Sequence, residues 1–126
     1  MMVVTTNEVP GYQIDAVLGE VMGLTVRTPN IAAGFVAGLR AIGGGEIDEY
    51  TKIMVESRQQ VMDRMVQQAM QRGANAVIMF RFDTGSIAQN YSEVCAYGTA
   101  VVISPIPAGQ PGSTAQSGQD AAAHGR

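Results

Sequence analysis

The sequence predicts one α+β domain, in which an antiparallel or mixed sheet is packed by one long helix. Three observations lead to this prediction. A length of 126 residues with 46% hydrophobic residues suits a single core. Extended segments stand at both ends of the predicted domain, and a long helical pattern runs between them. The expected element order is β-β-α-α-β-β.

The first two strands are expected over Met2 to Glu8 and over Tyr12 to Thr28. In the second strand, apolar residues alternate with other residues, as a strand with one face on a core requires. The residues on that predicted core face are Tyr12, Ile14, Ala16, Leu18, Met22, Leu24 and Val26.

Glu20 falls on the same alternation as these apolar residues, and two explanations are open. Either Gly19 and Gly23 bracket a bulge that turns Glu20 outward, or the carboxylate is held inside with a partner.

Two helices are expected next. A short one spans Ile31 to Ile42, and a long one runs from Glu46 to Arg72, with Gly73 as its left-handed cap. The long helix carries two apolar stripes, and one stripe is enough to pack on a sheet. The other stripe predicts contact with a neighbouring subunit, and its members are Val55, Met62, Val66 and Met70.

The last two strands are expected over 74–82 and 92–103, joined by a polar, mobile link over 83–91. In the final strand one face is built of small residues that would let a helix lie close, namely Ala96, Gly98 and Ala100. The side chains expected on its other face are Glu93, Cys95, Tyr97 and Thr99.

From Ser104 onward the composition shifts to Pro, Ala, Gly, Gln and Ser. Such a segment buries too little apolar surface to offset the entropy of ordering it. We therefore expect one oligomerising domain over 1–103 and a disordered tail over 104–126.

The formal net charge is -3, and the basic residues are scattered singly, so no basic stripe predicts nucleic-acid binding. The first ten residues do not resemble a secretory signal, and no stretch approaches the ~20 apolar residues of a membrane span. A single Cys cannot form a disulfide within its own chain. These features predict a cytoplasmic protein with a reduced thiol.

The sequence predicts no catalytic site. Its one His lies at position 124, in the predicted tail, so a nucleophile paired with His and a zinc site built from His are both excluded from the domain. We therefore expect a protein that is not an enzyme.

Four segments are similar to the YbjQ-like family of small bacterial proteins: residues 5–12, 44–51, 73–77 and 96–101. The similarity covers about residues 2–103. It implies an α+β protomer in a ring-shaped homo-oligomer, usually a pentamer, and the family carries a heavy-metal-binding label.

Cys95 is the only soft metal ligand in the predicted domain, and a free Cys in a strand is commonly a small core residue. One thiolate cannot complete a site that needs four ligands. In a ring, however, Cys95 and Glu93 would be repeated in every subunit and could bind a divalent or soft metal ion weakly between chains. Two functions stay open: a module that binds a metal or small ligand between subunits, and a structural or interaction ring with no ligand.

Overall fold

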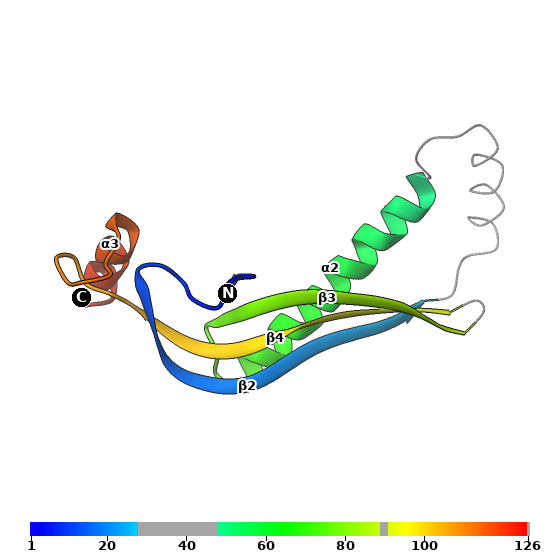
Figure 1. Ribbon diagram of the computed structural model, residues 1–126, viewed down its shortest axis with the longest axis horizontal. Coiled ribbons are helices and arrows are strands. Elements are labelled where there is room, and N and C mark those ends of the chain that lie inside the picture. The colour runs from blue at the N-terminus through cyan, green and yellow to red at the C-terminus, as the bar shows by residue number, and fades with distance from the viewer. Residues whose placement is uncertain (28–47, 89–90, 126) are drawn as a thin grey trace.

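The computed structural model describes residues 1–27, 48–88 and 91–125 and has the predicted α+β fold. Along the chain the elements are β1 (Met2–Val3), β2 (Tyr12–Arg27), α2 (Asp48–Gln71), β3 (Ala76–Ala88), β4 (Tyr91–Pro105) and α3 (Ala115–His124) (Figure 1). The helix predicted over Ile31 to Ile42 lies outside the described residues.

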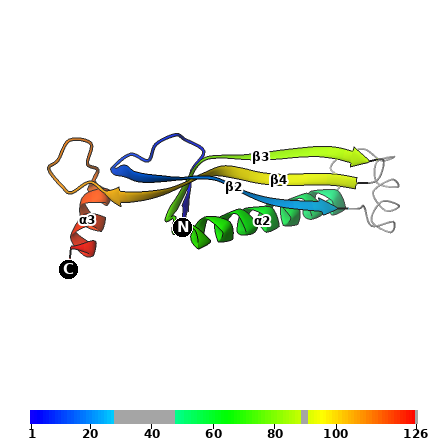
Figure 2. The ribbon, with the colours of Figure 1, turned by 90° about the horizontal axis from the view of Figure 1, so that it is seen from below.

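The four strands form one mixed sheet in the order β1-β3-β4-β2. β1 is parallel to β3, and the other pairs are antiparallel. α2 lies along one face of the sheet, and α3 lies beyond the end of the sheet where β4 finishes (Figure 2). Neither described helix is long and apolar enough to cross a membrane.

The long helix is confirmed over Asp48–Gln71, and its other predicted residues at the N-terminal end lie outside the described part. Gly73 has the predicted left-handed backbone, with φ +85°. The N–H of Ala74 donates to the carbonyl of Ala69 at 3.1 Å, and the N–H of Gly73 donates to that of Met70 at 3.0 Å. These two bonds form a Schellman cap, which satisfies the last carbonyls of the helix.

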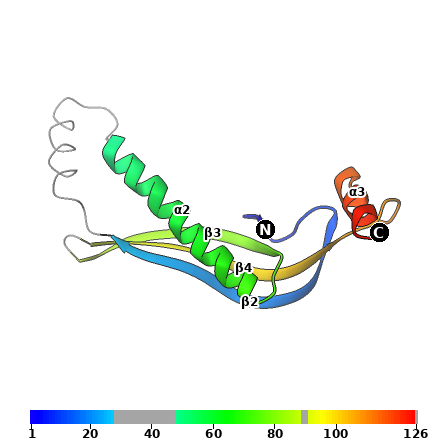
Figure 3. The same ribbon diagram turned by 180° about the vertical axis from the view of Figure 1, so that it is seen from behind.

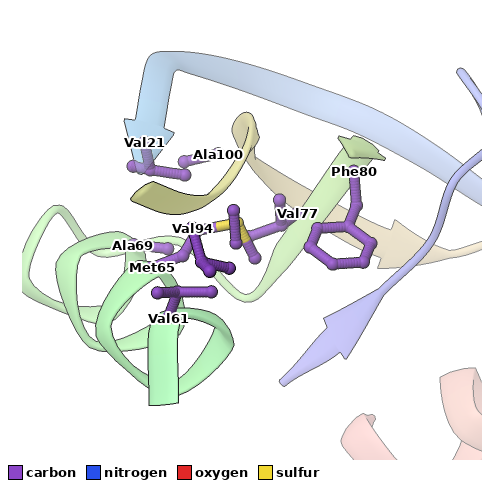
Figure 4. Close-up of a cluster of buried hydrophobic side chains, with 9 residues drawn as sticks. Val21, Val61, Met65, Ala69, Val77, Phe80, Val94 and Ala100 are labelled. Atoms are coloured by element: carbon purple, nitrogen blue, oxygen red, sulfur yellow. The ribbon is translucent and has the colours of Figure 1, made fainter. Parts of the chain in front are cut away.

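The main core lies between α2 and the sheet, which α2 crosses diagonally (Figure 3). Its buried residues are Val21, Val61, Met65, Ala69, Val77, Phe80, Val94, Ala96 and Ala100, most of them labelled in Figure 4. The small-residue face of the last strand therefore faces the helix, as predicted. The closest approach is at Gly23 of β2, where an added Cβ would lie 1.9 Å from the carbonyl oxygen of Val61.

The predicted core face of β2 is confirmed at Tyr12 and Leu18, which are half-buried against the two core clusters. It is wrong for the other predicted residues, which are exposed: Ile14, Ala16, Met22, Leu24 and Val26. Met22, Leu24 and Val26 are 44%, 43% and 49% exposed, whereas Val21 and Gly23 are buried against α2. At Gly23 the helix backbone leaves no room for a side chain, so the side of β2 that carries Val21 and Gly23 faces α2 and Met22, Leu24 and Val26 face away.

Two register shifts in β2, between Ile14 and Ala16 and between Val17 and Gly19, precede Glu20. Glu20 itself is exposed, which excludes the buried alternative. No local bulge is needed to turn Glu20 outward, because Met22 and Leu24 on the same side of the strand are exposed as well.

The N-terminal segment covers one end of the opposite side of the sheet, where Val9 packs in a second buried cluster with Ala76, Ile78, Val101 and Ile103. Beyond this cluster, no described segment covers that side. We call the uncovered part the outer sheet face. It consists of Glu20, Met22, Leu24 and Val26 from β2, Glu93, Cys95, Tyr97 and Thr99 from β4, and Arg81 and Asp83 from β3.

Side chains from α2 hold the free edge of β2. They follow one another at every fourth position, as Gln60, Arg64, Gln68 and, just after the helix, Arg72. Arg64 donates to the carbonyl of Leu24 at 2.6 Å and Arg72 donates to that of Glu20 at 2.5 Å. Gln68 accepts from the N–H of Met22 at 2.8 Å, and Gln60 accepts from the Arg27 side chain at 2.8 Å. We call these four residues the edge row.

The link predicted over 83–91 is largely strand. β3 continues to Ala88 and β4 begins at Tyr91, with Asp83 opposite Cys95 and Gly85 opposite Glu93. We predicted a link because this segment is polar. An antiparallel strand pair whose faces are exposed needs few apolar residues, so a polar segment can still form strands.

The prediction of a disordered tail is wrong for α3 and for the end of β4. Thr114 and Ser117 form a capping box at the start of α3, and Ser117 is 0% exposed. Its hydroxyl donates to the carbonyl of Ile106 at 2.9 Å, and the Tyr12 hydroxyl donates to Asp120. Polar contacts therefore order a segment that has too few apolar residues to form a core.

Candidate functional site

Cys95, the predicted metal ligand, lies in β4 on the outer sheet face. Its partners across the sheet are Leu24 of β2 and Asp83 of β3. Glu93 is two residues earlier in the same strand and shares the face, as predicted. The thiol is half-buried and makes a weak hydrogen bond to the carbonyl of Ala96, at 3.7 Å from sulfur to oxygen.

The carboxylates around Cys95 act on its ionisation. Burial raises the pKa of the Cys95 thiol, and the negative charges of Glu93, Asp83 and Glu20 raise that pKa further. The thiol is therefore kept protonated at neutral pH. A metal ion would have to displace this proton, while the same carboxylates would attract the ion.

The alternation of residues in one strand predicted that Cys95 and Glu93 share a face. The sequence alone could not predict that Asp83 and Glu20 lie on the same face. These residues come from three strands, and only the register of the sheet sets them near one another. Even so, residues 1–27, 48–88 and 91–125 of one protomer contain no group of three or more His, Cys, Asp or Glu side chains that could hold a metal ion. The described donors of one protomer thus do not fit a resident heavy metal, for which four ligands are usual.

Apolar side chains surround these polar groups. Met22, Leu24 and Val26 line one side of the outer sheet face, and Tyr97 is 38% exposed beside them. In the second stripe of α2, the helix on the other side of the sheet, Val55 and Met70 are 63% and 62% exposed. Met62 and Val66 of that stripe are instead half-buried and pack on the core.

Sequence reasoning missed a second group of residues, at the N-terminal half of α2. Ser57 is 1% exposed and its hydroxyl has no hydrogen-bond partner among the described residues. The signal was present in the sequence, because Ser57 interrupts a stripe of apolar residues at every fourth position, Ile53, Val61 and Met65.

The fold and the site define a class of protein: a small α+β domain with an uncovered sheet face that carries one thiol among carboxylates. The chain belongs to the YbjQ family described as "Putative heavy-metal-binding", whose model matches residues 1–104.

Curated relatives match most of the chain. The chain is 53% identical to a UPF0145 protein of Acidothermus cellulolyticus over 84% of its own length and 98% of that protein. It is 55% identical to a UPF0145 protein of Streptomyces griseus, over 84% of this chain and 88% of the relative. The shared name states no activity.

One solved structure shares the fold. It is a protein of unknown function of the DUF74 family from Pediococcus pentosaceus, with a TM-score of 0.53 and 15% identity. The match covers 82% of this chain and 97% of that structure.

Proposed function

We propose that the protein is a cytoplasmic, non-enzymatic homo-oligomer, a pentameric ring, that binds a divalent or soft metal ion between its subunits. The observation that carries the proposal is the outer sheet face, where Cys95 lies opposite Asp83 and two residues from Glu93, with Glu20 further along the same face and no described segment covering them. A thiol beside carboxylates offers mixed sulfur and oxygen ligands, which suit zinc or cadmium.

The distribution of exposed apolar residues supports a ring. α2 lies on the side of the sheet opposite the outer sheet face (Figure 2), and Val55 and Met70 of α2 are exposed. A contact between two different surfaces is heterologous, and such contacts form a ring when the rotation between subunits closes. Closure would repeat Cys95 and Glu93 in every subunit and supply the ligands that one protomer lacks.

Metal titration tests the proposed site. Metal-free wild type, Cys95→Ala and Glu93→Gln are titrated with zinc and with cadmium by calorimetry without reductant, and Glu8→Gln serves as the matched control outside the face. We expect weak binding by wild type and by Glu8→Gln and a marked loss in the other two variants. Binding should strengthen as pH rises, because the thiol must release its proton.

Absence of binding by wild type, or equal binding by all four proteins, would contradict the metal site. The second candidate function, a structural or interaction ring without a ligand, is favoured by the lack of a three-donor group among the described residues. Native mass spectrometry separates the two, since a ring without retained metal indicates the second.

A further inference from the structure

A small cavity lies between the N-terminal half of α2 and the adjacent ends of β2 and β4. It measures about 80 Å³ and is separate from the outer sheet face, because its walls come from the side of the sheet that α2 covers. Ile53, Met54 and Val94 give it apolar walls, and Arg27 and Ser57 contribute polar groups. A water molecule needs about 10–15 Å³ of such space, so the cavity holds several non-hydrogen atoms.

Two hydrogen-bond donors of this cavity are buried without partners among the described residues. One is the hydroxyl of Ser57, and the other is the Nε–H of Arg27. Arg27 is held in place, since its Nη2 donates to Gln60 at 2.8 Å. Buried polar groups in native proteins are nearly always paired, so two orphans beside one cavity indicate a missing acceptor.

The chemistry of the walls selects the class of ligand. The guanidinium is always charged, so it repels cations and binds an anionic acceptor more strongly than a neutral one. Tyr50 and Ser92 also line the cavity, but the described residues supply one cation, Arg27. A phosphate would bring up to two negative charges against that single guanidinium and the apolar walls, whereas a carboxylate brings one. A carboxylate with a short hydrocarbon chain matches the cavity, because its oxygens can accept from the polar groups and its chain can contact the apolar walls.

We propose that this cavity binds a small monocarboxylate. One or both of its oxygens accept hydrogen bonds from the Arg27 Nε–H and the Ser57 hydroxyl, and its hydrocarbon end lies against Ile53, Met54 and Val94. This site belongs to each protomer and does not rest on the proposed metal site, so either can fail while the other stands.

Calorimetric titration of the full chain with butyrate tests the proposal. We expect saturable binding, with a dissociation constant on the order of 0.1–1 mM for so small a ligand. Butyramide has the same shape without the charge and should bind at least about tenfold more weakly, as should inorganic phosphate.

Variants locate the binding site. Ser57→Ala and Arg27→Lys should each lose about tenfold or more in butyrate affinity, because each removes one donor. Arg72→Lys is the matched control, since Arg72 also contacts β2 but lies outside the cavity. Without butyrate, Ser57→Ala should unfold at the same temperature as wild type or higher, because it removes an unpaired buried hydroxyl. A merely structural role for Ser57 predicts the opposite.

The proposal is overturned if wild type shows no saturable butyrate binding, if Ser57→Ala and Arg27→Lys bind as wild type does, or if butyramide binds equally well. Tighter binding of phosphate than of butyrate would also overturn it, in favour of an inorganic oxyanion. Nuclear Overhauser effects from the butyrate methyl protons to Ile53 and Val94 provide direct support that does not depend on how any variant folds.

Discussion

At the scale of single residues, two glycines show how differently the same substitution acts in one sheet. Gly23 lies under the backbone of α2, so a side chain there would overlap Val61. Gly85, in β3, has nothing within 4 Å of the position where a Cβ would stand. The small size of Gly23 is therefore a requirement of the helix–sheet contact, whereas Gly85 is open to change.

Gly23→Ala should lower the free energy of unfolding by about 1–3 kcal/mol or more, because the helix must shift to admit the methyl group. Gly85→Ala should change it by no more than about 0.5 kcal/mol. Urea denaturation of both variants measures the difference, and equal stabilities would contradict the close contact at Gly23.

The ionisation of Cys95 gives a second prediction at this scale. Since burial and neighbouring carboxylates raise the pKa of Cys95, its reaction with iodoacetamide at pH 8 should be slower than that of an unfolded thiol. Glu93→Gln should accelerate it roughly twofold or more by removing one negative charge. Glu8 is not among the charges that act on Cys95, so Glu8→Gln should leave the reaction rate unchanged. A faster reaction in both variants would contradict this explanation.

At the scale of elements, sequence patterns placed the long helix, its cap and the small-residue face of β4, because each depends on neighbouring residues. Which side of β2 meets α2 could not be read from β2 alone. Met22, Leu24 and Val26 do alternate along the strand as predicted, but they lie on the outer sheet face, because the other side of β2 meets α2 at Gly23. Ser57 and Arg27 likewise come from distant segments, and only packing brings them to one cavity.

The pairing of Tyr12 with Asp120 makes the docking of α3 sensitive to pH at both extremes. The hydrogen bond from Tyr12, followed by the one from Gln116, lowers the pKa of Asp120. The stability that ionised Asp120 contributes is therefore fully present above the pKa of Asp in the unfolded chain, and it is lost as pH falls through the lowered pKa of the folded state. The hydrogen bond to Asp120 raises the pKa of Tyr12, so that contribution is lost only when pH rises through the raised value.

We therefore expect α3 to stay docked between about pH 4 and pH 10, the ordinary pKa values of Asp and Tyr, and to loosen only beyond them. Amide chemical shifts of α3 followed against pH measure this. Tyr12→Phe should remove the alkaline transition and move the acid transition toward higher pH. An unchanged profile in Tyr12→Phe would show that this hydrogen bond does not hold the helix.

At the scale of the whole molecule, the protomer has apolar side chains exposed on both sides, which a small monomer rarely tolerates over a continuous area. Val55 and Met70 are the cleaner probes of assembly, because Met62 and Val66 also belong to the packing around the core. The distinction matters, since a variant that unfolds tells nothing about contacts between subunits.

Replacing both Val55 and Met70 with Asp should dissociate the proposed ring without unfolding the chain, as each charge would have to be buried at the contact. The same change at Gln59 and Gln67, which are exposed on the same helix, should leave it assembled. Sedimentation at micromolar concentration measures this difference. A wild-type species of 13.3 kDa would contradict assembly altogether.

The edge row has a consequence for the behaviour of the protein at high concentration. β2 is a sixteen-residue outermost strand, the kind of template on which amyloid growth by strand addition begins. Arg64, Gln68 and Arg72 already occupy backbone groups that an incoming strand would use. The helix thus blocks strand addition at the edge of β2 while leaving the outer sheet face free, so the proposed assembly and fibre formation use different surfaces.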